Sequence, residues 1–227
     1  MTILMALFGL WAGNLLNLII ARQLASDEHP LPPQRAWIEW LPIAGTLRRK
    51  DWVGLAVEVT SAFMAATLVG SYGLGARSLF LFGASLVLID TGAVDFKIRM
   101  IDTLVLVIAT LVALLFAPLN ELRWLRSAQG LATAGAMFLF FFVLAKVLFR
   151  GVQAPFGLGD VYLAAFIGAL AGFYALPYAL FYGMGLAGAV ALALIVLRAF
   201  GRSVPTYISY GTYLCLGALF FLAFRAS

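Results

Sequence analysis

Two aspartates at the ends of apolar segments are the side chains of this sequence best suited to chemistry. Asp160 directly follows Gly157-Leu158-Gly159, where a polar stretch meets a long apolar one, and Asp95 lies in a similar setting far upstream. A carboxylate at the mouth of a membrane helix is costly unless it is solvated, paired or protonated, so it marks function by default. In a facing pair, one ionised carboxylate takes a proton from water while the protonated one polarises a peptide carbonyl. The two aspartates therefore predict a water-activating aspartyl protease.

The residues around this pair leave alternatives open. Gly157 and Gly159 would let the backbone turn sharply and approach a substrate strand closely. Asp90 lies five residues before Asp95, further into the same apolar segment. It is either a buried polar residue or the true partner of Asp160. Both Asp95 and Asp160 could instead be helix caps at the membrane surface, because Asp is a common N-cap residue.

Glu58, His29 and Cys215 are further polar or reactive side chains that we considered. Glu58 lies within an apolar segment, where a hydrogen bond across helices explains it better than direct catalysis. His29 is the sole histidine and Cys215 the sole cysteine, which excludes an internal disulfide and a Cys-based zinc site. A metal site needs several convergent ligands. We therefore expect no metal and no cofactor.

The composition places these residues in a membrane protein. The chain has 227 residues, of which 64% are hydrophobic and 11% charged, and its mean hydropathy is +1.03. A soluble domain of this size does not have that balance. The formal net charge of +5 comes mostly from cations between apolar segments. A topology signal explains them better than a nucleic-acid site.

Eight apolar segments predict an all-α bundle in one integral-membrane domain, residues 1–227. The first segment lacks the features of a cleaved signal peptide, so we expect it to be a retained helix. Between the first two segments lies a long loop, 24–52, whose prolines argue against a long helix. The expected transmembrane segments are 1–23, 53–71, 76–94, 103–119, 131–149, 160–176, 178–200 and 208–224.

The distribution of basic residues predicts the orientation. With both termini outside, 11 of the 15 basic residues fall on the inner side, as the positive-inside rule requires. The loop 24–52 is then cytoplasmic. Asp95, Asp102 and Asp160 also lie at the cytoplasmic face. The inner basic residues are Arg22, Arg35, Arg48, Arg49, Lys50, Lys97, Arg99, Lys146, Arg150, Arg198 and Arg202.

Several motifs together resemble one known family. The stretch 156–161 matches a GxGD motif, and Asp95 through Thr103 resembles a D-x-x-x-x-x-I-P-D/N segment. These features are similar to those of the prepilin peptidases, bacterial inner-membrane aspartyl proteases that cleave leader peptides from type IV prepilins and pseudopilins. Further similar positions are Gly13-Asn14-Leu15-Leu16-Asn17 with Arg22, Trp40-Leu41-Pro42-Ile43, Glu58, Pro205 and the region from Tyr210 to Gly217.

The resemblance implies a role for each matching residue. Asp95 and Asp160 would be the catalytic pair, which favours Asp95 over Asp90. Gly157, Gly159, Asn17 and Glu58 would support substrate binding or the motif. The enzyme would lie in the bacterial inner membrane with its active site at the cytoplasmic face. Its partners would be a prepilin or pseudopilin and membrane lipids, with no nucleic acid.

Four departures from the family pattern limit what is implied. Tyr162 stands where members usually have a lysine, no proline follows Ile101, and Asn14 replaces a serine. The loop 24–52 lacks the two Cys-x-x-Cys pairs of bifunctional members. This excludes zinc in that loop and leaves N-methylation of the product open.

Two rival functions follow from the same residues. Another GxGD-type intramembrane protease acting on a membrane stub would share the aspartates, but the helix number and the N-terminal motif argue against it. A proton-coupled small-molecule transporter would instead use Asp90 and Glu58, because intramembrane carboxylates also serve as proton relays.

Overall fold

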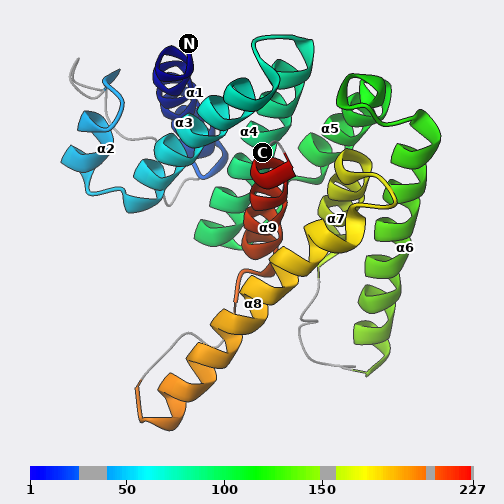
Figure 1. Ribbon diagram of the computed structural model, residues 1–227. Coiled ribbons are helices and arrows are strands. Elements are labelled where there is room, and N and C mark those ends of the chain that lie inside the picture. Colours follow the sequence, from blue (N-terminus) through cyan, green and yellow to red (C-terminus); the bar gives the residue numbers. More distant parts are fainter. Residues whose placement is uncertain (26–39, 149–156, 203–207, 226–227) are drawn as a thin grey trace. The chain divides into compact units, whose positions relative to one another are not determined.

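The computed structural model describes residues 1–25, 40–148, 157–202 and 208–225, and all regular structure in this part of the chain is helical (Figure 1). The elements are α1 (Thr2–Gln23), α2 (Ala44–Arg49), α3 (Trp52–Tyr72), α4 (Ala76–Ile98), α5 (Thr103–Leu115), the 3-10 helix η2 (Ala117–Asn120), α6 (Trp124–Leu148), α7 (Leu158–Ala171), α8 (Leu176–Ala199) and α9 (Tyr210–Arg225).

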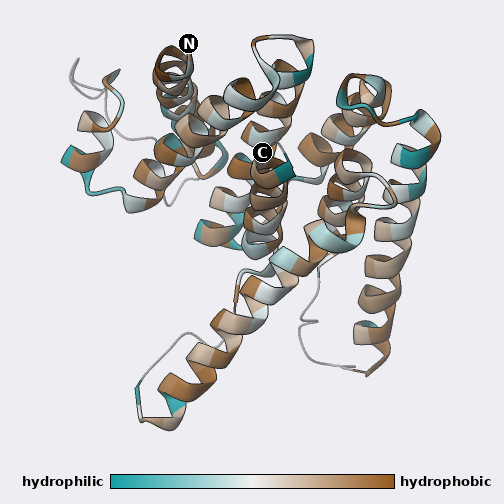
Figure 2. Cartoon of the chain, viewed as in Figure 1, coloured by the Kyte–Doolittle hydropathy of each residue, from teal (hydrophilic) through white to brown (hydrophobic). Residues whose placement is uncertain are grey.

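The long helices have the composition of membrane spans. By length and composition, α1, α3, α4, α6 and α8 can each cross a bilayer, while α5, α7 and α9 are apolar but shorter. Figure 2 shows that hydrophobic residues dominate the long helices, whereas hydrophilic residues gather at helix ends and connections. The prediction of an all-α polytopic membrane protein is confirmed.

The helix boundaries differ from the expected segments at several points. Helix α4 continues past residue 94 to Ile98, so Asp95 lies inside the helix rather than after it. Helix α6 begins at Trp124 and not at 131, because its first turns pack against α7 through Ser127 and Gly130. Helix α5 ends at Leu115 and a 3-10 turn containing Pro118 follows, since proline cannot continue an α-helix.

Two further boundaries concern α7 and the long loop. Helix α7 ends at Ala171 instead of 176 because Gly172 adopts a φ of 72° and a ψ of 167°, a positive-φ conformation that glycine tolerates. The described part of the loop contains the six-residue helix α2. His29, within this loop, lies outside the described residues.

The chain forms two compact units. The first comprises Met1–Arg99 with Leu222–Ser227. Within it, α1 packs along α3, and α3 packs against α4. A Cβ on Gly13 would lie 2.7 Å from the Cα of Glu58. Small residues of this kind allow two membrane helices to cross closely, and here the crossing brings α1 next to Glu58.

The second unit, Met100–Phe221, is organised around α7, which packs against α5 and α6. A Cβ on Gly130 of α6 would collide with the carbonyl oxygen of Gly168 on α7, so the two helices touch through their backbones. At the end of α7, Ser127 donates to the Ala169 carbonyl at 2.7 Å and Asn120 to the Leu170 carbonyl at 3.0 Å. These bonds satisfy carbonyls that lack partners at a helix end.

Candidate active site

Asp160 lies in the first turn of α7. Its exposed fraction is 8%, and its Oδ2 accepts a hydrogen bond from the Gly157 amide at 3.0 Å. A carboxylate three residues into a helix often bonds back to the N-cap amide in this way. Gly157 itself has φ −92° and ψ 159°, an extended conformation open to any residue. Asp160 is therefore not the N-cap expected as its alternative role: Gly157 is the N-cap, and Asp160 bonds back to it from the third helical position, which orients the carboxylate.

Gly159 is packed against another part of the same unit. A Cβ on Gly159 would lie 2.7 Å from the Cβ of Ile101, so the missing side chain makes room for Ile101. The next residue, Asp102, is the N-cap of α5 and accepts from the Leu104 amide at 2.9 Å. The starts of α5 and α7 thus lie side by side, with the Ile101 side chain packed against Gly159.

Tyr210 begins a region that resembles the family, but the sequence did not indicate that it acts on Asp160. It is the first residue of α9 and interacts electrostatically with Asp160. Its ring also lies 6.3 Å from that of Phe138 on α6, centroid to centroid. The surroundings of Asp160 therefore include an aromatic hydroxyl that is distant from it in the sequence.

Asp95 lies in the last turn of α4, in the first unit, and is 5% exposed. Its backbone carbonyl accepts from the Arg99 amide at 2.8 Å, where Arg99 ends the helix in a left-handed conformation. Asp90 is similarly buried, at 6% exposed, and accepts from the Gln23 side chain on α1 at 3.2 Å. Asp90 thus has a partner that ties α4 to α1.

The two candidate catalytic aspartates belong to different units. Asp95 is described within Met1–Arg99 and Asp160 within Met100–Phe221. Each is a buried carboxylate near the end of an apolar helix. Their pairing remains a prediction from the sequence.

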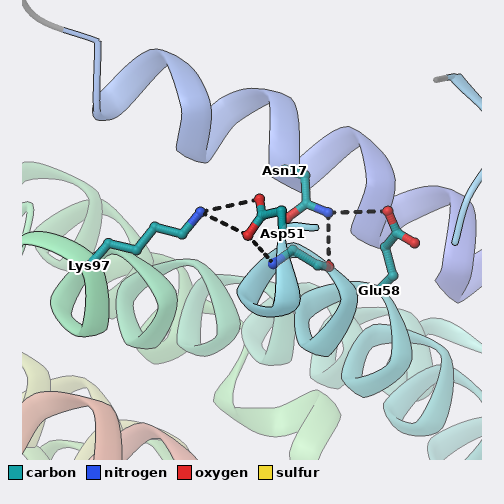
Figure 3. Close-up of polar contacts among 5 residues, drawn as sticks. Asn17, Asp51, Glu58 and Lys97 are labelled. Atoms are coloured by element: carbon teal, nitrogen blue, oxygen red, sulfur yellow. Dashed lines mark hydrogen bonds and ion pairs between the residues drawn. The ribbon is translucent and has the colours of Figure 1, made fainter. Parts of the chain in front are cut away.

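Glu58 is the centre of a buried polar cluster that joins α1, α3 and the segment before α2. It is fully buried, and its carboxylate accepts from Asn17 Nδ2 at 3.2 Å, from the Thr46 hydroxyl at 3.4 Å and from the Ile43 amide. Asn17 also donates to the Gly54 carbonyl at 3.0 Å (Figure 3). The expected hydrogen bond between Glu58 and another helix is therefore present.

The backbone at Ile43 adopts an unusual conformation. Its φ of 66° and ψ of −52°, with a hydrogen bond from the Ala44 amide to the Pro42 carbonyl at 2.7 Å, define a γ-turn of the strained type. A β-branched residue rarely adopts positive φ. Glu58 holds this turn by accepting from the Ile43 amide, and Asn14 bonds the Trp40 carbonyl at 2.7 Å. The segment leading into α2 is thus fixed to α1 and α3.

An ion pair links the start of α3 to the end of α4. Asp51 is the N-cap of α3 and accepts from the Gly54 amide at 3.0 Å. Lys97, in the last turn of α4, lies 3.3 Å from the Asp51 carboxylate (Figure 3). From the sequence, Lys97 is expected to be a topology signal, with the steering of an acidic substrate or of lipid head groups as the alternative. An Asp directly before an apolar run is a recognisable N-cap signal, but its partner 46 residues away is not visible in the sequence.

The described residues contain no group of three or more His, Cys, Asp or Glu side chains that could hold a metal ion. Metal-free chemistry nevertheless stays a prediction, since part of the loop 24–52 is outside the described residues.

Comparison with known proteins gives a family for the chain. Residues 79–193 match the type IV leader peptidase family. That range is slightly more than half of the chain and includes Asp90, Asp95, Gly159 and Asp160, whereas Glu58 lies before it. Neither curated proteins nor solved structures gave a match. The chain therefore belongs to the type IV leader peptidase family, and it is a peptidase built from membrane helices.

Proposed function

We propose that this protein is an aspartyl endopeptidase that cleaves the leader peptide of type IV prepilins or pseudopilins. The observation that carries the proposal is that the family match spans both Asp95 and Asp160. Each of these carboxylates is also buried at the end of an apolar helix. Burial of an ionisable group in a membrane helix is costly and is expected where the group has a function.

The chemistry requires the two carboxylates to share the work of proton transfer. One, ionised, takes a proton from a water molecule, and the resulting nucleophile attacks the scissile carbonyl. The other, protonated, donates a hydrogen bond to the carbonyl oxygen as negative charge develops on it. Protonation of the leaving amine then completes the cleavage. No covalent intermediate forms with the enzyme.

We propose that the substrate approaches from the cytoplasmic face of a bacterial inner membrane. The positive-inside rule places the basic stretch Arg48-Arg49-Lys50 on that side, and Lys97 with it. The ion pair between Asp51 and Lys97 supports this shared side, because it holds the two basic stretches at one end of the first unit. A basic leader would stay in the cytoplasm, while the apolar helix of the prepilin would lie in the bilayer beside the enzyme.

The proposal is tested by co-expressing the protein with a prepilin from the same genome and following loss of the leader by gel shift. We expect cleavage with the wild type and with Asp90→Asn, and none with Asp95→Asn or Asp160→Asn. Asp102→Asn is the matched control. It changes an aspartate of the same segment but keeps a good N-cap for α5, and we expect it to cleave.

Other outcomes would revise or reject the proposal. Cleavage by Asp95→Asn together with loss in Asp90→Asn would make Asp90 the partner of Asp160. Cleavage by Asp160→Asn would reject the aspartyl mechanism. If the wild type cleaves neither this prepilin nor a second, more distant one, the prepilin substrate is rejected.

A further inference from the structure

The helices α3 and α4 form a hairpin that is closed at both ends. At one end, the short connection Gly73–Gly75 joins them. At the other end, the chain is not continuous, and the Asp51–Lys97 ion pair bridges the N-cap of α3 and the last turn of α4. A carboxylate at a helix N-terminus and an ammonium at a helix C-terminus each also interact favourably with the helix dipole. Both partners are therefore well placed for the pair.

Lys97 holds the turn of α4 that carries Asp95. Asp95 and Lys97 are two residues apart on an α-helix, so their side chains point to nearly opposite sides of the helix. Asp95 is accordingly buried, at 5% exposed, while the Lys97 side chain is 28% exposed and reaches Asp51. The neighbours Phe96 and Ile98 are 55% and 43% exposed, so they contribute little packing. The ion pair thus ties this turn to the N-cap of α3 through a side chain.

Asp51 is itself a fixed anchor. Its carboxylate accepts from the Gly54 amide at 3.0 Å, and the Gly54 carbonyl accepts from Asn17, which also bonds Glu58 (Figure 3). The chain of hydrogen bonds therefore runs from the buried carboxylate of Glu58, through the first turn of α3, to the ammonium of Lys97. A partner held this firmly restricts the position of the lysine as well.

We propose that Asp51 and Lys97 are positioning residues of the peptidase reaction. They fix the last turn of α4 and so set the direction in which the Asp95 carboxylate points. The inference rests on the proposed function, because it takes Asp95 to be catalytic. Neither residue contacts the substrate. Orientation of a reacting group contributes strongly to rate, and small displacements are costly, so loosening this turn lowers the rate of the chemical step.

Two other roles for Lys97 make different predictions. If Lys97 only sets the membrane topology, the effect of replacing Lys97 is the same whether or not Asp51 is present. If it attracts an acidic part of the substrate, its loss raises KM. In that case Asp51→Asn leaves KM unchanged or lowers it, because the lysine becomes free.

The experiment compares variants of the whole protein in nanodiscs, with the prepilin of the cleavage assay as substrate. Asp51→Asn keeps an N-cap but removes the charge, and Lys97→Gln keeps the chain length. We expect each to lower kcat about fivefold with little change in KM, as for loss of a pair worth about 1 kcal/mol. The double variant is no slower than the slower single variant, and Lys97→Arg restores most of the rate.

Lys50→Asn is the matched control. It removes a neighbouring positive charge at a residue whose φ of 56° suits asparagine, and we expect wild-type kcat. A second measurement, amide hydrogen exchange, reports folding and local order without activity. Peptides covering residues 95–99 should exchange about five times faster in Asp51→Asn and Lys97→Gln, with other helices unchanged.

Three results would overturn the inference: wild-type kcat and exchange in both variants, an effect confined to KM of Lys97→Gln, or an equal effect of Lys50→Asn. Failure of the proposed function is distinguishable. It shows as cleavage by Asp95→Asn, and the exchange data then still tell whether the ion pair holds the end of α4.

Discussion

The two helices that carry the aspartates are held in place by different kinds of contact. The end of α4 is fixed through polar side chains, with Lys97 bonded to Asp51 and Asp90 to Gln23. The start of α7 is fixed by shape, because Ile101 occupies the space that a side chain at residue 159 would take. Further along, α7 touches α6 backbone to backbone at Gly130.

Because these contacts differ in kind, we expect the end of α4 and the helix α7 to respond to different substitutions. An ion pair with side chains 28% and 38% exposed is weakened by salt and by loss of either charge. A close contact between two backbones does not depend on charge, but it is disrupted when a larger side chain is introduced. Substitutions that change charge should therefore affect the α4 end, and substitutions that change size should affect α7.

The largest effect is expected at the crossing of α6 and α7. In Gly130→Ala, the new methyl group would meet the Gly168 carbonyl and would lie 2.8 Å from the carbonyl carbon of Gly172. Because these atoms belong to the backbone, the helices must move apart, and we expect a loss of about 3 kcal/mol in the free energy of unfolding. Denaturant titration in detergent micelles measures it.

Gly135→Ala is the control for that prediction. It lies on the same helix, but its Cβ would be 3.6 Å from the Cβ of Ala165, an ordinary contact. We expect unchanged or slightly higher stability, since alanine favours helices more than glycine does. Equal losses in the two variants would show that the crossing is not specific to Gly130.

A smaller effect is expected within the GxGD motif itself. Gly159→Ala places a methyl group against Ile101, which displaces the first turn of α7 and with it Asp160. We expect kcat for leader cleavage to fall about 100-fold, the usual cost of a misplaced reacting group. Ile101→Gly in the same chain should restore part of the rate, because it removes the Cβ that the new methyl group would meet.

Gly157→Ala tests whether the motif requires glycine at residue 157. Its backbone is extended, and the nearest atom to a new Cβ is the Asp160 carboxylate oxygen at 3.8 Å. We therefore expect nearly wild-type kcat. A rate as low as that of Gly159→Ala would mean that the motif needs glycine at 157 for contact with the substrate.

The smallest effect concerns the cluster around Glu58. Glu58→Leu removes an acceptor of the half-buried Asn17 amide, of the Thr46 hydroxyl and of the Ile43 backbone amide. We expect a loss of about 2 kcal/mol, the usual contribution of hydrogen bonds to a charged acceptor, together with faster hydrogen exchange in residues 40–46. Glu58→Gln keeps one oxygen and should lose less. Equal stability of all three proteins would contradict a structural role for Glu58.

The sequence predicted the helices well because hydropathy marks apolar stretches long enough to form membrane helices. The eight expected segments correspond to α1 and α3 to α9. The end of α4 was missed because Phe96 to Ile98 follow the apolar run with a mixed pattern, and the helix continues there with Lys97 bonded to Asp51. Hydropathy carries no information on such a bond.

The surroundings of the aspartates were less predictable. The sequence identified Asp160 by its motif, but it could not show that Ile101 packs against Gly159, since the two are far apart in the sequence. The positive φ of Ile43 opposes the normal preference of a β-branched residue. It becomes understandable only when the bond from its amide to Glu58 is known.

The length of α7 has a consequence for the depth of Asp160 in the bilayer. With 14 residues and a rise of about 1.5 Å per residue, the helix is about 21 Å long, whereas the hydrocarbon core of a bilayer measures about 30 Å. If one end of such a helix lies at one membrane interface, its other end therefore lies within the hydrocarbon core, short of the second interface. Either lipids thin around this helix or polar groups of the protein admit water to its first turn. For a helix anchored at the far interface, the short length of α7 thus sets the distance that water must cross to reach the Asp160 carboxylate.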